Sequence, residues 1–117
     1  MSDTVLVRFT VEGPPVGKER PRKGRGRHFY TPTKTKIYEQ AVRLAFLCTA
    51  KRKLDPPATW VRVHCFFRNG RHPDPDNVLK LVLDGLCGHA YPNDRAVNSS
   101  VDLVTDADRP RIEVEVG

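Results

Sequence analysis

Three features common in other classes of protein are missing from this chain. No apolar run approaches the roughly 18 residues that a membrane-spanning helix requires, so we expect no membrane association. The start, MSDTVLVRFTVEG, lacks the basic head and apolar stretch of a secretion signal, and we expect a cytoplasmic protein. Cys48, Cys65 and Cys87 are widely separated and form no C-x-x-C pair, which excludes a recognisable zinc motif or disulfide framework and predicts reduced core thiols.

Acidic residues are also scarce relative to basic ones. The chain has 14 Asp and Glu against 20 Lys and Arg, which gives a formal net charge of +6 and a pI near 9.5. Such a balance favours a polyanionic partner, and nucleic acid is the first candidate. At 117 residues the chain is long enough for one hydrophobic core, so we expect a single domain over residues 1–117.

The apolar pattern predicts two helices and four strands. Alternating apolar residues indicate strands over residues 4–12 and 59–68, and AVNSSVDLVT and RIEVEV are typical of a closing hairpin. A helix is expected from Thr33 to about Lys53, and a second one follows residue 76. The order β-α-β-α-β-β predicts an α+β domain with two helices packed on one face of a small mixed β-sheet.

Each predicted helix has an apolar stripe that we expect to face the core. The stripe of the first helix is formed by Ile37, Ala41, Leu44, Ala45 and Cys48, and that of the second by Leu79, Val82, Leu83 and Leu86. In the second helix Asn77, Lys80 and Asp84 fall on a different, polar face. That face is free for chemistry.

The segment GPPVGKERPRKGRGRH, residues 13–28, predicts an irregular basic loop because glycine, proline and positive charge dominate it. We expect it to contact phosphates, together with two arginines that flank the acidic motif described next. The expected DNA-binding residues are Lys18, Arg20, Arg22, Lys23, Arg25, Arg27, Arg68 and Arg71.

Two aspartates, Asp74 and Asp76, flank a proline in RHPDPDNVLKLVLDGL, just before the second helix. Residues before proline favour extended backbone, so both carboxylates are expected to face one point. Asp-Pro-Asp is equally typical of a helix N-cap with no other role. Asp94 lies at the start of the next strand and would come close if that strand pairs beside the second one. Three such carboxylates, without His or Cys, favour Mg²⁺ or Mn²⁺.

The run Asp74-Pro-Asp76-Asn77-x-x-Lys80-x-x-x-Asp84-Gly-Leu, followed by Asn93-Asp94, resembles the RusA-type Holliday junction resolvases. Their pattern is D-x-D-N-x-x-K-x-x-x-D-(A/G)-L followed by an acidic pair. GPPVGKERPR and FYTP also match the family's layout, so the resemblance covers nearly the whole chain. One departure is Asn93, which stands where the family often has an aspartate and can offer only a carbonyl oxygen.

The resemblance implies a Mg²⁺-dependent, homodimeric endonuclease of a bacterial or phage-infected cell, which nicks four-way DNA junctions symmetrically in recombination and repair. Mn²⁺ could replace Mg²⁺. By position Asp74, Asp76 and Asp94 are the implied metal-binding acids and Lys80 the implied catalytic lysine. Supporting roles fall to Asn77, Asp84 and Asn93.

Two other interpretations stay open on the sequence alone. The chain could be a metal-dependent nuclease for flaps, ordinary duplex or RNA, because nothing in the basic loop distinguishes these shapes. It could also be a non-catalytic nucleic-acid-binding module in which the acids only begin a helix.

Overall fold

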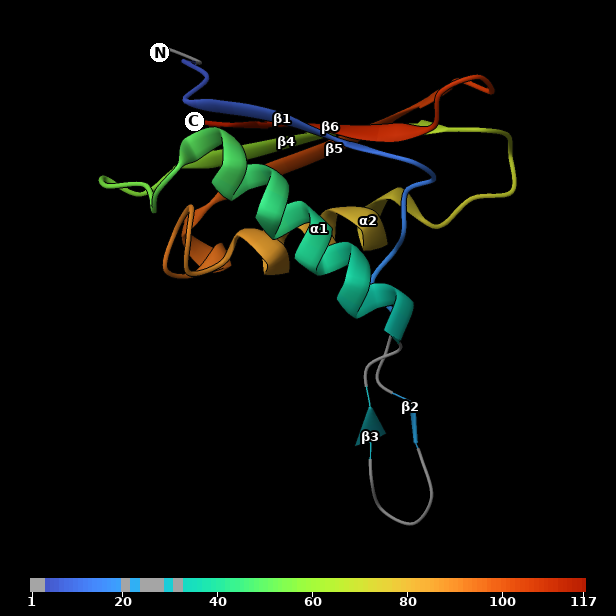
Figure 1. The fold of residues 1–117 in the computed structure, drawn as a ribbon, viewed down its shortest axis with the longest axis horizontal. Coiled ribbons are helices and arrows are strands. Elements are labelled where there is room, and N and C mark those ends of the chain that lie inside the picture. The colour runs from blue at the N-terminus through green and yellow to red at the C-terminus, as the bar shows by residue number, and fades with distance from the viewer. Residues whose placement is uncertain (1–3, 20–21, 24–28, 31–32) are drawn as a thin grey trace.

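The computed structural model describes residues 4–19 and 33–117, together with the backbone of residues 22–23 and 29–30. Its central element is a four-stranded mixed sheet in the order β1-β6-β4-β5. The strands are β1 (Val7–Glu12), β4 (Trp60–Phe67), β5 (Asn98–Thr105) and β6 (Arg111–Val116). Helices α1 (Thr33–Ala50) and α2 (Pro75–Leu86) cover one face of the sheet (Figure 1). The predicted α+β class and element order are confirmed.

Three short elements add to this plan. Strands β2 (Arg22–Lys23) and β3 (Phe29–Tyr30) pair antiparallel in a separate two-stranded sheet. The prediction of irregular backbone over residues 13–28 is therefore wrong at Arg22 and Lys23. In Figure 1 this pair lies away from the main sheet, beyond the start of α1. A 3-10 helix, η1 (Asp94–Ala96), precedes β5.

The core forms where the alternating strands meet the helices. In β1, β4 and β6 the residues that face the helices are buried, as the alternation predicts. They are Val7, Phe9, Val11, Val61, Val63, Cys65, Phe67, Ile112, Val114 and Val116. Phe9 meets Phe46 of α1 edge to face, with ring centroids 6.2 Å apart. Cys65 is the one cysteine that fulfils the core expectation, because Cys48 and Cys87 are exposed; all three are free thiols.

The predicted core face of α1 is wrong at Ile37, Leu44 and Cys48, whereas Ala41 and Ala45 pack against the core as expected. Its buried residues are Thr35, Tyr38, Val42 and Phe46, whereas Ile37 and Leu44 are each 61% exposed. The reason is tertiary, since α1 has apolar side chains around much of its circumference. Its backbone passes so close to Gly85 of α2 that a Cβ there would lie 3.2 Å from the Glu39 carbonyl oxygen. The helix also ends before Lys53, because Lys51 adopts a left-handed backbone with φ of 66°.

The predicted closing hairpin is also wrong. β5 and β6 do not pair, because β4 lies between them. β4 pairs antiparallel with β6 and parallel with β5, in a register that places Trp60 opposite Asn98 and Phe67 opposite Thr105. α2 is part of the connection between the two parallel strands, and its apolar side is buried at Val82 and Leu86 as predicted, while Leu79 and Leu83 are half-buried. None of the helices in the described part of the chain is long and apolar enough to span a membrane.

The sheet face opposite the helices is charged, and His64 lies there between two carboxylates. Its Nδ1 is 2.9 Å from Oδ1 of Asp102 on β5, and its Nε2 is 3.1 Å from Oε1 of Glu115 on β6. Burial lowers the pKa of His64, but the hydrogen bonds to Glu115 and Asp102 outweigh burial and raise the pKa above its usual value. When it is protonated, the ring donates a hydrogen bond to a carboxylate on each of the two strands beside β4.

We expect this link to make stability depend on pH. Because the pKa of His64 is raised in the folded protein, its contribution is complete below the unfolded value of about 6.5 and is lost as pH rises through the folded value. His64→Gln should lower the free energy of unfolding more at about pH 6 than at about pH 8.5, by roughly 0.2–1 kcal/mol per ion pair. Urea denaturation measures the difference, with His89→Gln as a control. An equal loss at both pH values would contradict the assignment.

Candidate active site

The acidic motif lies where β4 ends and α2 begins. The connection is held by His72, whose ring stacks on Phe67 with centroids 4.0 Å apart, and whose Nδ1–H donates to the Pro73 carbonyl over 2.7 Å. Arg68 and Arg71 lie on this connection and are both exposed. Both arginines thus precede the acids on an exposed segment, and their contact with DNA stays a prediction.

Asp74 is the N-cap of α2. Its backbone is extended, and its Oδ1 accepts a hydrogen bond of 2.9 Å from the Asp76 N–H. Pro75 occupies the first helical position, where its missing N–H costs nothing. The expectation that Asp74 and Asp76 share one extended segment is therefore wrong, since Asp76 is already helical. Both residues remain exposed, and the cap occupies only one oxygen of Asp74.

Lys80 lies one turn further along α2 and is exposed. Within the described residues neither Asp76 nor Asp84 forms an ion pair with it. Asp84 pairs instead with Lys18, whose Nζ lies 2.5 Å from Asp84 Oδ2. The Lys80 ammonium is thereby left available to a ligand at the start of the helix.

Asp94 is placed differently from the expectation. Asn93 caps η1, because its Oδ1 accepts from the Arg95 N–H at 3.0 Å, and Asp94 is the first residue of that turn. The charges of Asp84 and Asp94 both raise the pKa of Lys18, after the larger effect of the Lys18–Asp84 hydrogen bond. Asp94 therefore belongs to the turn that leads into β5, and its charge reaches Lys18.

The three predicted metal ligands do not converge in this structure. Across residues 4–19 and 33–117, no group of three or more His, Cys, Asp or Glu side chains is arranged to hold a metal ion. β5 does pair beside β4, as the sequence reasoning assumed. However, the pairing is parallel, so β5 begins at the Trp60 end of β4, whereas Asp74 follows the Phe67 end. Exposed carboxylates still fit a hard cation by chemistry, with two of them at the start of α2.

Residues 16–19 lead into the pair of strands β2 and β3, which we call the basic hairpin, and these residues dock on α2. The Lys18 N–H donates to the Asn77 carbonyl at 2.9 Å. At Gly17 an added Cβ would lie 3.1 Å from Pro73 Cβ and 3.2 Å from Asn77 Cβ, so a side chain there would force these neighbours to move. Sequence reasoning named Lys18 as a phosphate contact but missed this docking role. The glycine between Val16 and Lys18 was the available signal.

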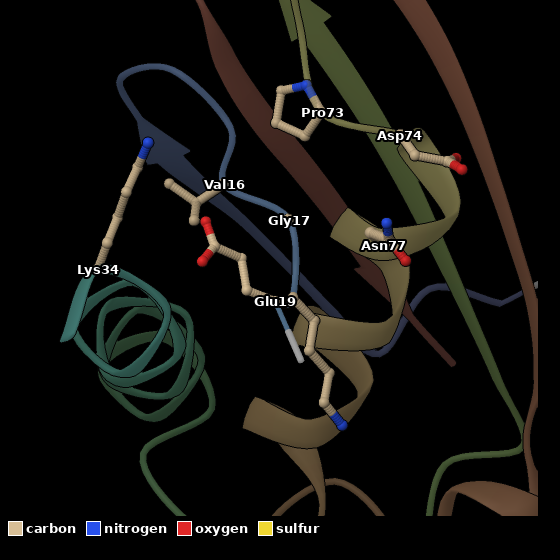
Figure 2. Close-up of a pocket in the computed structure, with 8 residues that line it drawn as sticks. Val16, Gly17, Glu19, Lys34, Pro73, Asp74 and Asn77 are labelled. Carbon is tan, nitrogen blue, oxygen red and sulfur yellow. The ribbon is translucent and has the colours of Figure 1, made fainter. Parts of the chain in front are cut away.

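A cavity of about 250 Å³ lies beside this docking contact. Its lining comes from the docked segment and the starts of both helices, and comprises Val16, Gly17, Lys18, Glu19, Lys34, Pro73, Asp74 and Asn77. Figure 2 shows the Asp74 carboxylate directed away from Val16, Gly17 and Glu19. The cavity and the carboxylate therefore face different sides of the helix start.

Of the other predicted DNA contacts, Arg20, Arg25 and Arg27 lie outside the described residues, and only the backbone of Arg22 and Lys23 is described. Lys18, which leads into this stretch, is held at α2 by both its backbone and its side chain. The basic hairpin is thus attached beside the acidic motif.

Exposed carboxylates and an exposed lysine on α2, with exposed arginines on the segment before it, offer charges that suit a cation and a phosphate backbone. The model of the family described as Endodeoxyribonuclease RusA matches residues 12–117. The chain therefore belongs to the RusA endodeoxyribonuclease family, and the resemblance seen in the sequence is confirmed. No curated protein compared with the chain matches it.

The docking contact can be tested by filling the space at Gly17. Gly17→Val should push the segment off α2, and because overpacking costs about 1–3 kcal/mol, we expect the Lys18 N–H to exchange roughly 10–100 times faster. Hydrogen exchange measures this directly. Gly70→Val is the matched control, since an added Cβ there meets nothing within 4 Å. Unchanged exchange at Lys18 would show that the contact is not close.

Proposed function

We propose that this endonuclease acts as a homodimer with Mg²⁺ as its cofactor and resolves four-way DNA junctions by paired symmetrical nicks. It would act in recombination and repair in the cytoplasm of a bacterial or phage-infected cell. The observation that carries the proposal is the exposed set of Asp74, Asp76 and unpaired Lys80 at the start of α2. Family membership supports the nuclease class.

Asp74 and Asp76 would hold the cation, with Mn²⁺ as a substitute, and Asp94 is the proposed third ligand. Asp74 has one carboxylate oxygen outside its cap bond, and Asp76 is exposed. Like charges about 4 Å apart repel by roughly 4 kcal/mol at an effective dielectric near 20, which disfavours gathering three carboxylates without a cation. Moving Asp94 toward the others is therefore the change that metal binding would favour.

The side chains around the acids would position the DNA backbone. When bound, the cation lowers the pKa of its water and neutralises charge that develops on the phosphate. Lys80 would stabilise that charge from the polar face of α2. Arg68, Arg71 and Lys18 would hold flanking phosphates, which positions the strand without reading its sequence. Asn77 and Asp84 act indirectly, because they anchor Lys18.

The cleavage assay compares a synthetic four-way junction with a linear duplex, each with and without Mg²⁺. Wild type should place paired nicks in the junction alone, only with metal. Asp76→Asn should lose roughly 10²–10³-fold in rate, the size expected when one group that stabilises transition-state charge is removed. DNA binding should persist or tighten, because a negative charge facing phosphate is removed.

Asp108→Asn is the matched control, since it makes the same change at an exposed site between β5 and β6. Equal cutting of the linear duplex would contradict junction selectivity and favour a general nuclease. Cutting without metal would contradict the mechanism. Full activity of Asp76→Asn would indicate that Asp74 and Asp76 only begin the helix and take no part in catalysis.

Metal binding is tested separately by titration with Mn²⁺ and electron paramagnetic resonance. We expect Asp76→Asn and Asp94→Asn each to weaken Mn²⁺ binding at least about 10-fold, as loss of a ligand should. Asp108→Asn again serves as the control. If Asp94→Asn bound Mn²⁺ with wild-type affinity, this result would contradict the role of Asp94 as a metal ligand.

A further inference from the structure

Helix α1 carries an apolar stripe that the hydrophobic core leaves largely exposed. This α1 stripe is formed by Ile37, Ala41, Leu44 and Cys48. Steps of four, three and four residues place its members on one side of the helix, in the spacing by which one helix packs against another. Ile37 and Leu44 are each 61% exposed, and Cys48 is exposed as well. The core side of α1 is formed by Thr35, Tyr38, Val42 and Phe46.

The stripe borders a cavity of about 450 Å³ between α1, β1 and the chain that follows β1. Its apolar lining is formed by Val11, Val16, Ile37, Tyr38 and Ala41. Of its two charged residues, Glu12 is paired with Arg109, whereas Lys34 is exposed. Binding pockets of roughly 300–1,000 Å³ with mainly apolar walls are typical of ligand sites. The α1 stripe thus leads into a space that can take apolar side chains of a partner.

The charges around the stripe are almost all positive. Residues 33–53 contain six Lys and Arg but only one acid, Glu39, which pairs with Arg43. The other five cations are exposed and lie beyond the two ends of the stripe. They are Lys34, Lys36, Lys51, Arg52 and Lys53. Within the described part of the chain, none of the ion pairs involves these five.

This arrangement of charges selects among the occupants of the stripe. A second copy is a poor one, because antiparallel α1 helices would bring Lys34 and Lys36 against residues 51–53, and parallel helices would bring each group against itself. Like charges across an interface suppress such pairing. A DNA backbone matches the cations but offers no apolar side chains to Ile37 and Leu44. A protein segment that is apolar in its middle and acidic at both ends matches both features.

We propose that the α1 stripe is a docking site for an amphipathic helix of another protein, with apolar residues at heptad spacing and acidic residues in its first and last turns. From Ile37 to Cys48 the stripe runs about 17 Å, which a partner helix of about 12 residues matches. α2 packs on a different side of α1, at Glu39 and Val42. The docked helix therefore tethers the endonuclease to a second protein and leaves the polar face of α2 open.

A synthetic peptide serves as the probe. It has about 18 residues, because shorter helices are marginal in water, with leucine at heptad spacing and glutamate in its first and last turns. Fluorescence anisotropy measures its binding to the whole chain at about 50 mM salt, where we expect a dissociation constant of about 10 µM. A peptide of the same composition in shuffled order, and one with lysine in place of glutamate, should each bind at least about 10-fold more weakly.

Leu44→Gln tests the stripe on the protein. It should weaken binding of the acidic peptide about 10–100-fold, the range expected when one buried leucine contact is lost. Leu103→Gln is the matched control, because Leu103 on β5 is 50% exposed and lies outside the stripe. Its affinity for the peptide should equal that of wild type. Circular dichroism verifies that both variants are folded.

Absence of peptide binding at about 100 µM protein, or wild-type affinity in Leu44→Gln, would overturn the proposal. Equal binding of the shuffled peptide would overturn it too, since charge alone would then explain the attraction. Two further measurements address the other occupants. Weaker binding of a linear DNA duplex by Leu44→Gln would assign the stripe to DNA, and a wild-type dimer that Leu44→Gln converts to a monomer in sedimentation velocity would assign it to a second copy. Either result would overturn the proposal.

Discussion

The parallel pairing of β4 with β5 is the constraint on which the rest of the molecule depends. Two parallel neighbours cannot be joined by a tight turn, so the chain must return along the sheet, and α2 provides part of that return. The helix thereby starts at the Phe67 end of β4 and the chain reaches β5 at the Trp60 end. The acids before α2 and Asp94 before β5 are consequently separated by the length of the crossover. The polar face of α2 spans the distance between them.

The second consequence concerns the basic hairpin. Its start is fixed to α2 by a backbone hydrogen bond, by the Lys18–Asp84 ion pair and by the absence of a side chain at Gly17. The ion pair is weak alone, because a pair with both partners partly exposed contributes only about 0–1 kcal/mol to stability. Together the three contacts bring a cationic segment next to a helix that begins with acids. Residues far apart in the chain thus form one charged surface with opposite signs side by side.

The charged side of the sheet has a different role. His64, Asp102 and Glu115 tie three neighbouring strands on the face that the helices leave open. Cations also lie on aromatic rings there, with the Arg111 guanidinium 3.7 Å from the Phe66 centroid. These contacts hold β4 and β6 firmly, whereas β5 is tied to the sheet on one side only. The strand that follows Asp94 is therefore the least enclosed part of the sheet.

The sequence by itself determined the four strands of the main sheet, the two helices, the buried face of each alternating strand and the acidic motif of the family. Those features follow from local periodicity and from residues close together in the chain. Tertiary structure alone decided that β5 lies beside β4 and not β6, and that α1 buries Phe46 and not Leu44. It also decided that the Asp94 turn leads into β5 at the Trp60 end of β4, away from the start of α2. The physical reason is the same in each case, because strand order and the choice between two apolar helix faces depend on contacts between distant segments.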